Sequence, residues 1–216
     1  AHLVGGDYFG YLPLARPDAP PGTAPRWAVV LADVMGKGMP AALLMARLSA
    51  EVRVLLLTEP DPARAVERLN QELYDAELGE RFITFLLVLL DGQDHRLTIV
   101  NAGHWAPLIR RAGGRVEVIG QEQSGMSLAV FDDQSYQAVA TGIEPGDVVL
   151  LYTDGVNEAM NPRNEPFGSR RLHQALLAAP GPVPAVGQAV LRAVQAHTAG
   201  QDQSDDITLV CFGRER

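Results

Sequence analysis

The chain has 216 residues, with 26 Asp and Glu against 18 Lys and Arg, which gives a formal net charge of −8. This balance argues against a nucleic-acid module, which needs a basic stripe, and the 47% hydrophobic content excludes a disordered chain. Charged residues at Arg47, Glu51 and Arg53 interrupt the longest apolar stretch, so no membrane span is expected. The one cysteine, Cys211, cannot form an internal disulfide, which favours a reducing compartment and a cytoplasmic location.

Strand signals run through most of the sequence. Proline-rich residues 17–25 predict a loop between two strands, because proline cannot donate a ladder hydrogen bond. Further segments are rich in Val, Ile, Leu, Phe and Thr and bounded by Gly, Asp, Asn or Pro, as is typical of strands. These segments are residues 27–33, 82–90, 96–101, 106–110, 115–119, 136–141, 147–153 and 207–212. Two links between them, DGQDH and AGG, are short enough for hairpins, so we expect largely antiparallel sheets.

Helical periodicity appears between these strands. From Pro40 onward, apolar residues recur with the period of a helix. Asp61 followed by Pro62 is typical of a helix N-cap and first turn. Residues 169–178 and 184–197 predict two shorter amphipathic helices.

These elements together predict the fold. The strongest strands are continuous apolar runs, so both of their faces must be covered. In an antiparallel arrangement, a second sheet covers one face and helices cover the other. We therefore predict an α+β fold, a four-layer α/β/β/α sandwich of two mainly antiparallel sheets flanked by helices. No long linker divides the chain, so we expect a single domain over residues 1–216.

Acidic residues interrupt the apolar framework where strands begin or end. They are Asp7, Asp33, Asp154, Asp205 and Asp206. Carboxylates gathered at a sheet edge repel one another unless a cation neutralises them, and Mg²⁺ or Mn²⁺ does so with oxygen ligands. Neighbouring glycines such as Gly155 would let the backbone turn tightly beside such ions. Taken singly, each aspartate could equally be a turn or helix-capping residue.

Short motifs follow one another in a fixed order from about residue 4 to residue 212. They are VGGDYF, LADVMGKGMPAALLMARL, TFLLVLLD, NAGHWAPLI, GDVVLLYTDGVNEAMN, PFG and SDDITLV. Together they resemble the PPM (type 2C-like) metal-dependent serine/threonine phosphatases, in particular the bacterial branch of the sporulation stage II E and stress-response phosphatases. The resemblance implies the same four-layer sandwich, with two Mn²⁺ or Mg²⁺ ions at one edge of the paired sheets.

The resemblance also implies roles for individual residues. Asp33 would bridge both metals, and Val34 would offer its backbone carbonyl to one of them. Asp154 and Asp205 would be ligands of one metal, so that Asp33, Asp154 and Asp205 would be catalytic through the bound metals and water. Asp7 would act on the metals directly or through water.

Other positions match the family less closely. Asp206 and Gly155 would support the ligands without binding metal themselves. Gly10 stands where relatives often carry another aspartate, Lys37 replaces a more usual histidine, and Trp105 replaces a smaller residue. These departures leave every implied ligand in place.

The implied activity is hydrolysis of phosphoserine or phosphothreonine on a regulatory protein, an anti-sigma-factor antagonist, by a metal-activated water without a phospho-enzyme. The implied partners are this substrate and a regulatory domain or partner protein, with no nucleic acid and no membrane span. Because relatives commonly carry an N-terminal regulatory domain, we expect the sequence to be an excised catalytic domain.

Other interpretations stay open. The same fold could serve as a catalytically silent regulator that binds a partner, or as a metal sensor without turnover. GKGMPA imitates a dinucleotide-binding fingerprint, but the chain lacks alternating strand and helix units. For His104 we favour a turn histidine that bonds its own hairpin over a general acid, and for Cys211 a buried strand position.

Overall fold

A computed structural model describes residues 5–15, 20, 23, 25–36, 38–74, 81–179, 181, 183–201, 203 and 205–215. The chain divides into two compact units. Unit 1 comprises Ala1–Ala106 and Gly120–Gly142, and unit 2 comprises Pro107–Ile119 and Ile143–Arg216. The division into two compact units does not test the expectation of a single domain, which stays a prediction.

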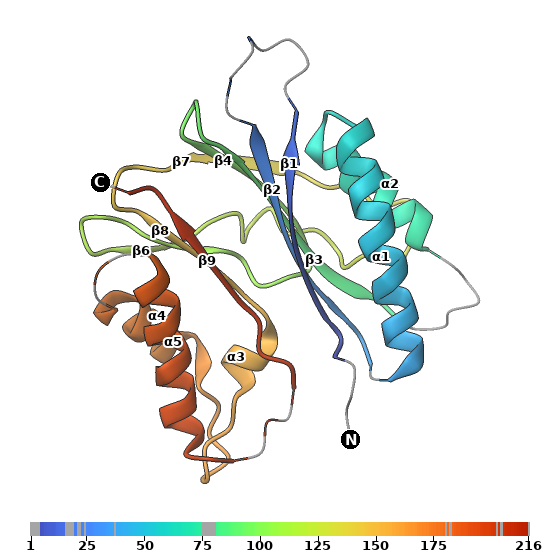
Figure 1. Cartoon of the computed structure of the whole chain (residues 1–216). Helices are drawn as coiled ribbons and strands as arrows, with labels where there is room; N and C mark the ends of the chain where they lie inside the picture. Colours follow the sequence, from blue (N-terminus) through green and yellow to red (C-terminus); the bar gives the residue numbers. More distant parts are fainter. Residues whose placement is uncertain are drawn as a thin grey trace. The chain divides into compact units, whose positions relative to one another are not determined.

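Unit 1 contains, in its described part, a five-stranded antiparallel sheet with the strand order β1-β2-β3-β4-β7. Its strands are β1 (Asp7–Leu14), β2 (Arg26–Val34), β3 (Ile83–Asp91), β4 (Arg96–Ala102) and β7 (Ala138–Gly142). Helices α1 (Met39–Thr58) and α2 (Pro62–Leu73) pack side by side along this sheet (Figure 1).

Helix α1 covers the sheet through the apolar stripe that the sequence predicted. Leu44, Leu48 and Val52 are buried and form one core cluster with Val30 and other residues of β2. Alternate residues of a strand point to opposite faces, so every second residue of β2 turns toward α1. The remaining residues of β2 point to the opposite face of the sheet.

Helix α2 begins as its sequence predicts. The Asp61 side chain accepts hydrogen bonds from the backbone N–H groups of Ala63 and Arg64, at 2.9 and 3.1 Å. Pro62 occupies the first turn, where its missing N–H has no helical partner to lose. The inward residues Val66 and Leu69 are buried in the same core cluster as α1.

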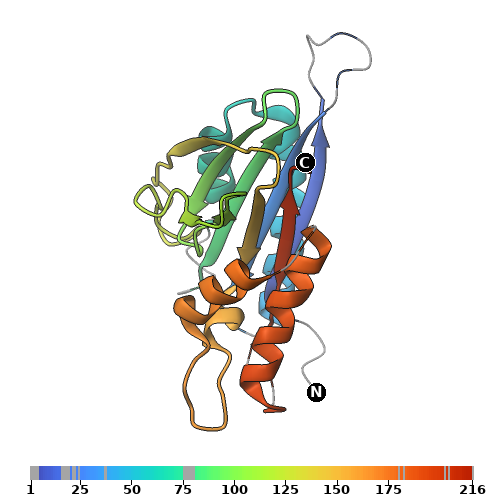
Figure 2. The same ribbon diagram turned by 90° about the vertical axis from the view of Figure 1, so that its left-hand side faces the viewer.

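Unit 2 contains, among its described residues, a four-stranded antiparallel sheet with the order β6-β5-β8-β9. Its elements are β5 (Leu108–Arg110), β6 (Val116–Val118), β8 (Val148–Tyr152), α3 (Asp154–Glu158), α4 (Gly168–Ala178), α5 (Val183–Thr198) and β9 (Leu209–Gly213). Helix α5 runs alongside β9, and α4 packs against α5 (Figure 2). Their buried side chains, such as Leu172, Leu176 and Val190, form a second core cluster with Leu150 of β8.

A buried carboxylate fixes one end of the unit 2 sheet. Asp147, directly before β8, accepts hydrogen bonds from Arg111 Nη1 at 2.8 Å and from the backbone N–H groups of Ala112 and Glu144, each at 2.9 Å. Burial disfavours the charged form, but these hydrogen bonds and the Arg111 charge outweigh burial and lower the pKa of Asp147. The Asp147 carboxylate therefore joins the turn after β5 to the turn before β8.

The predicted α+β fold of two antiparallel sheets flanked by helices is confirmed. The predicted strands all occur with shifted ends, and the hairpins at DGQDH and AGG join β3 to β4 and β5 to β6. The loop predicted at residues 17–25 implied a strand before it without giving the bounds of β1, and helix α3 was not assigned from the sequence. The segments at 106–110 and 115–119 form shorter strands than expected. Cys211 lies partly buried in β9. In the part of the chain that the structure describes, we find no helix with the length and apolarity to cross a bilayer.

Candidate metal centre

Two of the implied ligands face each other in unit 1. Asp7 on β1 lies directly opposite Asp33 on β2. A hydrogen bond from Val34 N to Gly6 O, 3.1 Å long, marks the adjacent pair as hydrogen-bonded. Asp7 and Asp33 therefore form a non-hydrogen-bonded pair, in which opposed side chains share a face and approach most closely. Both are partly buried, so a cation would relieve the repulsion between their carboxylates.

The sheet places this pair on the face away from α1. Ala32 and Val34, the neighbours of Asp33, belong to the core cluster that packs against the helices. Because strand residues alternate between faces, Asp33 points to the other side. Thr84 on β3 is paired with Asp33, so Asp7, Asp33 and Thr84 form a row across three strands.

The oxygen atoms that the resemblance assigns to a metal approach the chain closely at Gly6. A Cβ at Gly6 would lie 2.9 Å from Val34 O and 3.1 Å from Asp33 Oδ1. One carbonyl oxygen and one carboxylate oxygen thus lie beside the same glycine. Such an all-oxygen donor set suits a hard divalent cation, so the residues of unit 1 fit a Mg²⁺ or Mn²⁺ ion.

The His104 ring is hydrogen-bonded to Thr84 of this row. Its Nδ1 lies 2.7 Å from Thr84 Oγ1. Its backbone is held by Asn101, whose Nδ2 donates to His104 O at 3.0 Å and whose Oδ1 accepts from His104 N at 2.8 Å. The backbone contacts match the predicted turn histidine, but the ring bonds β3 beside Asp33 instead of its own hairpin. Sequence reasoning missed Thr84 and Asn101, although both lie within the quoted motifs TFLLVLLD and NAGHWAPLI.

In unit 2, Gly155 brings two acidic segments into contact. Asp154 opens α3 directly after β8, and Asp205 and Asp206 precede β9. A Cβ at Gly155 would overlap the backbone carbonyl oxygen of Asp206. The chain at Asp154 therefore passes against the chain at Asp206 at a distance that only glycine allows.

Hydrogen bonds hold these two segments in register. Thr153 N donates to Thr208 O at 3.2 Å, and Thr208 N donates to Thr153 Oγ1 at 3.0 Å. Asp205 Oδ1 accepts from Asp206 N at 3.0 Å, and Asp205 O accepts from Gln203 Nε2 at 2.6 Å. Asp205 also lines a cavity of about 310 Å³ together with residues of α3 and α5. Hydrogen bonds between the two backbone segments therefore join the segment that carries Asp154, after β8, to the segment that carries Asp205, before β9.

The implied ligands are thereby grouped in two sets. Unit 1 holds Asp7, Asp33 and Val34, and unit 2 holds Asp154 and Asp205. Among the residues that the structure describes, no three His, Cys, Asp or Glu side chains form a group that could hold a metal ion.

The departures from the family pattern have different outcomes. At Gly10, a Cβ would lie 2.7 Å from the hydroxyl of Tyr8, so an aspartate there would displace the Tyr8 ring. Trp105 is 40% exposed. Lys37 lies outside the described residues.

The sequence of this chain is similar to a protein family and to curated proteins of known function. A family model described as Stage II sporulation protein E (SpoIIE) matches residues 23–215. Phosphoserine phosphatase RsbU of Bacillus subtilis (strain 168) is 29% identical over 130 residues, covering 60% of this chain and 38% of RsbU. The chain spans less than half the length of the curated relatives that it matches.

Solved structures share the fold. The PP2C phosphatase domain of SpoIIE from Bacillus subtilis, solved with a fragment of its regulatory domain, has a TM-score of 0.81 at 20% identity. That match covers 99% of this chain and 60% of the other. RsbX in complex with magnesium has a TM-score of 0.65 at 17% identity, over 96% of this chain and 86% of that one. The chain therefore belongs to the stage II sporulation protein E family and has the fold of its PP2C-type phosphatase domain.

Proposed function

We propose that this chain is a divalent-metal-dependent phosphatase domain that hydrolyses phosphoserine or phosphothreonine on a regulatory protein. The observation that carries the proposal is the facing pair Asp7 and Asp33, with the Val34 carbonyl oxygen beside Asp33 Oδ1. The family and the likeness to a phosphoserine phosphatase support the same activity.

The proposed cofactor is a pair of Mg²⁺ or Mn²⁺ ions. Asp33 would bridge the two ions, Val34 would bind one through its carbonyl oxygen, and Asp7 would act directly or through a water. Asp154 and Asp205, which belong to unit 2, are proposed as metal ligands as well. The oxygen-only donors of unit 1 and the magnesium bound by RsbX support a hard divalent cation.

When bound, the metals would supply an activated water and positive charge for the phosphoryl oxygens. The chain itself contributes fixed positions for the ligands. Asp33 is held between β1 and β3, because its strand pairs on both sides. Asp154 follows Thr153, which is hydrogen-bonded to Thr208, the residue directly before β9. Gly155 and Asp206 support that geometry by their close backbone contact.

The proposed substrate is a phosphorylated anti-sigma-factor antagonist, and the proposed control is by a regulatory domain or partner protein in the cytoplasm. Membership of the SpoIIE family and the likeness to RsbU support these assignments.

The test is Mn²⁺-dependent hydrolysis of p-nitrophenyl phosphate and of a phosphoserine protein by the parent chain and by Asp33→Asn. We expect the substitution to reduce turnover at least about a hundredfold, because it removes the charge of a metal ligand. Asp94→Asn, in the exposed hairpin between β3 and β4, is the matched control and should retain activity.

A parent chain inactive on both substrates would overturn the proposal. Calorimetry then separates the remaining interpretations. Binding of Mn²⁺ without turnover would indicate a metal sensor, and absence of metal binding would indicate a silent regulator.

A further inference from the structure

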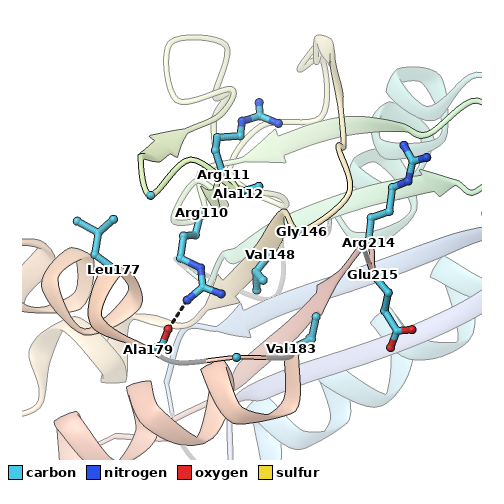
Figure 3. Close-up of a pocket in the computed structure, with 12 residues that line it drawn as sticks. Arg110, Arg111, Ala112, Gly146, Val148, Leu177, Ala179, Val183, Arg214 and Glu215 are labelled. Carbon is cyan, nitrogen blue, oxygen red and sulfur yellow. Dashed lines mark hydrogen bonds between the residues drawn. The ribbon is translucent and has the colours of Figure 1, made fainter.

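A cavity of about 670 Å³ opens in unit 2, separate from the implied metal ligands (Figure 3). It lies where the end of β5 and the start of β8 meet the C-terminal end of α4 and the first residue of α5. Its lining combines apolar and charged side chains, among them Arg110, Val148, Leu177, Val183, Arg214 and Glu215. This volume is in the range of small-molecule binding sites, which are mostly apolar with a few polar groups.

Among the described residues, only one nitrogen of the Arg110 guanidinium has hydrogen-bond partners. Its Nη1 donates to the carbonyl oxygens of Ala179 at 2.5 Å and Leu176 at 3.3 Å, at the end of α4. Figure 3 shows the Arg110 side chain reaching toward Ala179. A guanidinium has five N–H donors, and no hydrogen bond from its Nε or Nη2 occurs within the described residues. The Nε and Nη2 edge can bind a carboxylate or phosphate with two parallel hydrogen bonds.

The neighbouring Arg111, by contrast, is paired with two carboxylates of the same unit. It bonds Glu117 through Nε at 2.7 Å and Asp147 through Nη1 at 2.8 Å. Arg110 is the last residue of β5 and Arg111 follows it. Arg111 meets these two carboxylates, while Arg110 reaches the end of α4. Within the described part of unit 2, Arg110 has no carboxylate within 4 Å.

The charge at this site is positive although the chain as a whole is negative. Arg214 donates through Nη1 to Ile143 O at 3.2 Å and forms no ion pair with another described residue. The lining holds three arginines, Arg110, Arg111 and Arg214, and one carboxylate, Glu215. Because Arg111 is paired with Glu117 and Asp147, the charges of Arg110 and Arg214 remain against that of Glu215. The Arg110 charge also acts on Cys211 of β9. Burial raises the pKa of the Cys211 thiol, to about 11, and the positive charge of Arg110 opposes that rise.

The rest of the lining suits an apolar group. Val148, Val183 and Ala179 present aliphatic atoms beside Arg110, and Leu177 is 45% exposed at the rim. We propose that this cavity binds a small molecule that joins an oxyanion, a carboxylate or phosphate, to an apolar body. The oxyanion pairs with Arg110 and Arg214, and the body lies against the aliphatic lining.

The test titrates benzoate and phenyl phosphate into the full chain by calorimetry, with EDTA present to keep any metal centre empty. We expect saturable binding of one ligand per chain. Tighter binding of benzoate would identify a carboxylate ligand, and tighter binding of phenyl phosphate a phosphate ligand. Inorganic phosphate, which lacks the apolar body, should bind at least about tenfold more weakly, the equivalent of about 1.4 kcal/mol.

Two variants locate the site. Arg110→Gln should weaken binding at least about tenfold, while Arg192→Gln, on the exposed side of α5, is the matched control and should not. Because Arg110 also bonds the end of α4, Leu177→Glu provides a second variant that places a repelling carboxylate at the rim. No saturable binding by the parent chain, or binding unchanged in both variants, would overturn the proposal.

Discussion

Gly6 lies so close to Val34 that a Cβ on Gly6 would be 2.9 Å from the Val34 carbonyl oxygen. The same Cβ would be 3.1 Å from Asp33 Oδ1. In proteins, such distances force a neighbour to shift, and here the first neighbour is backbone. The space beside Gly6 is therefore occupied by the two oxygen atoms proposed as metal ligands.

Gly6→Ala should displace these oxygens by a few tenths of an ångström. We expect a fall of about tenfold or more in Mn²⁺-dependent kcat/KM on p-nitrophenyl phosphate and a higher Mn²⁺ requirement. Gly92→Ala, at a hairpin glycine with open space around it, is the matched control. Equal Mn²⁺ requirements in the parent and Gly6→Ala would contradict the assignment of the Val34 and Asp33 oxygens.

Gly155→Ala should disturb the contact between the Asp154 and Asp206 segments. The new methyl group would overlap the Asp206 carbonyl oxygen, and overpacking against backbone costs about 1–3 kcal/mol. We expect that loss in the free energy of unfolding, measured by urea denaturation in metal-free buffer. Gly113→Ala, in the open turn between β5 and β6, should change stability by less than about 0.5 kcal/mol. If Gly155→Ala has the same free energy of unfolding as the parent chain, the two segments are not in contact.

Thr84→Val should release the His104 ring while keeping the shape of the side chain. The lost hydrogen bond to Nδ1 is worth about 0.5–1.5 kcal/mol in the free energy of unfolding. We also expect turnover to fall several-fold with little change in KM, because Thr84 is paired with Asp33. Thr98→Val on β4 is the matched control, and identical losses in both variants would show that Thr84 has no special role.

Asp147 should make stability depend on acid pH. Its pKa is lowered in the folded protein, so its contribution is complete above the ordinary aspartate pKa and is lost as pH falls below about 4. Asp147→Asn removes one partner of the buried pair with Arg111 and should cost about 3 kcal/mol at pH 7. Its unfolding free energy should also fall less steeply below pH 4.

Urea unfolding from pH 3 to pH 7, with EDTA present, measures both effects. Asp133→Asn, an exposed position in unit 1, should leave the acid dependence unchanged. If Asp147→Asn has the same acid dependence as the parent chain, Asp147 is not the group responsible.

Much of the framework could be predicted because its signals are local. The run WAVVLA followed by Asp33, and the run VVLLYT followed by Asp154, each mark a buried strand that ends at a carboxylate. Asp61 and Pro62 likewise mark a helix start by their own chemistry. The bounds of strand β1 were not predicted because Gly10 and Pro13 weaken its strand pattern, although an edge strand tolerates both.

The finer parts of the site depend on contacts between distant segments. The need for glycine at Gly155 comes from Asp206, which is far away in sequence. The Thr84 hydroxyl meets His104 only after β3 and β4 have paired. The resemblance supplied the identity of the proposed ligands, but neighbouring residues in the chain carry no signal for these contacts.

The one-sided pairing of β1 also determines how its amide protons behave in heavy water. Tyr8 and Gly10 direct their N–H groups toward β2, whereas Phe9 and Tyr11 direct theirs outward, where no other described strand lies. Exchange of amide hydrogen for deuterium should therefore be slow at Tyr8 and Gly10 and fast at Phe9 and Tyr11. The slow positions give a direct reading of how often this strand detaches and carries Asp7 away from Asp33, while the rest of the sheet stays folded.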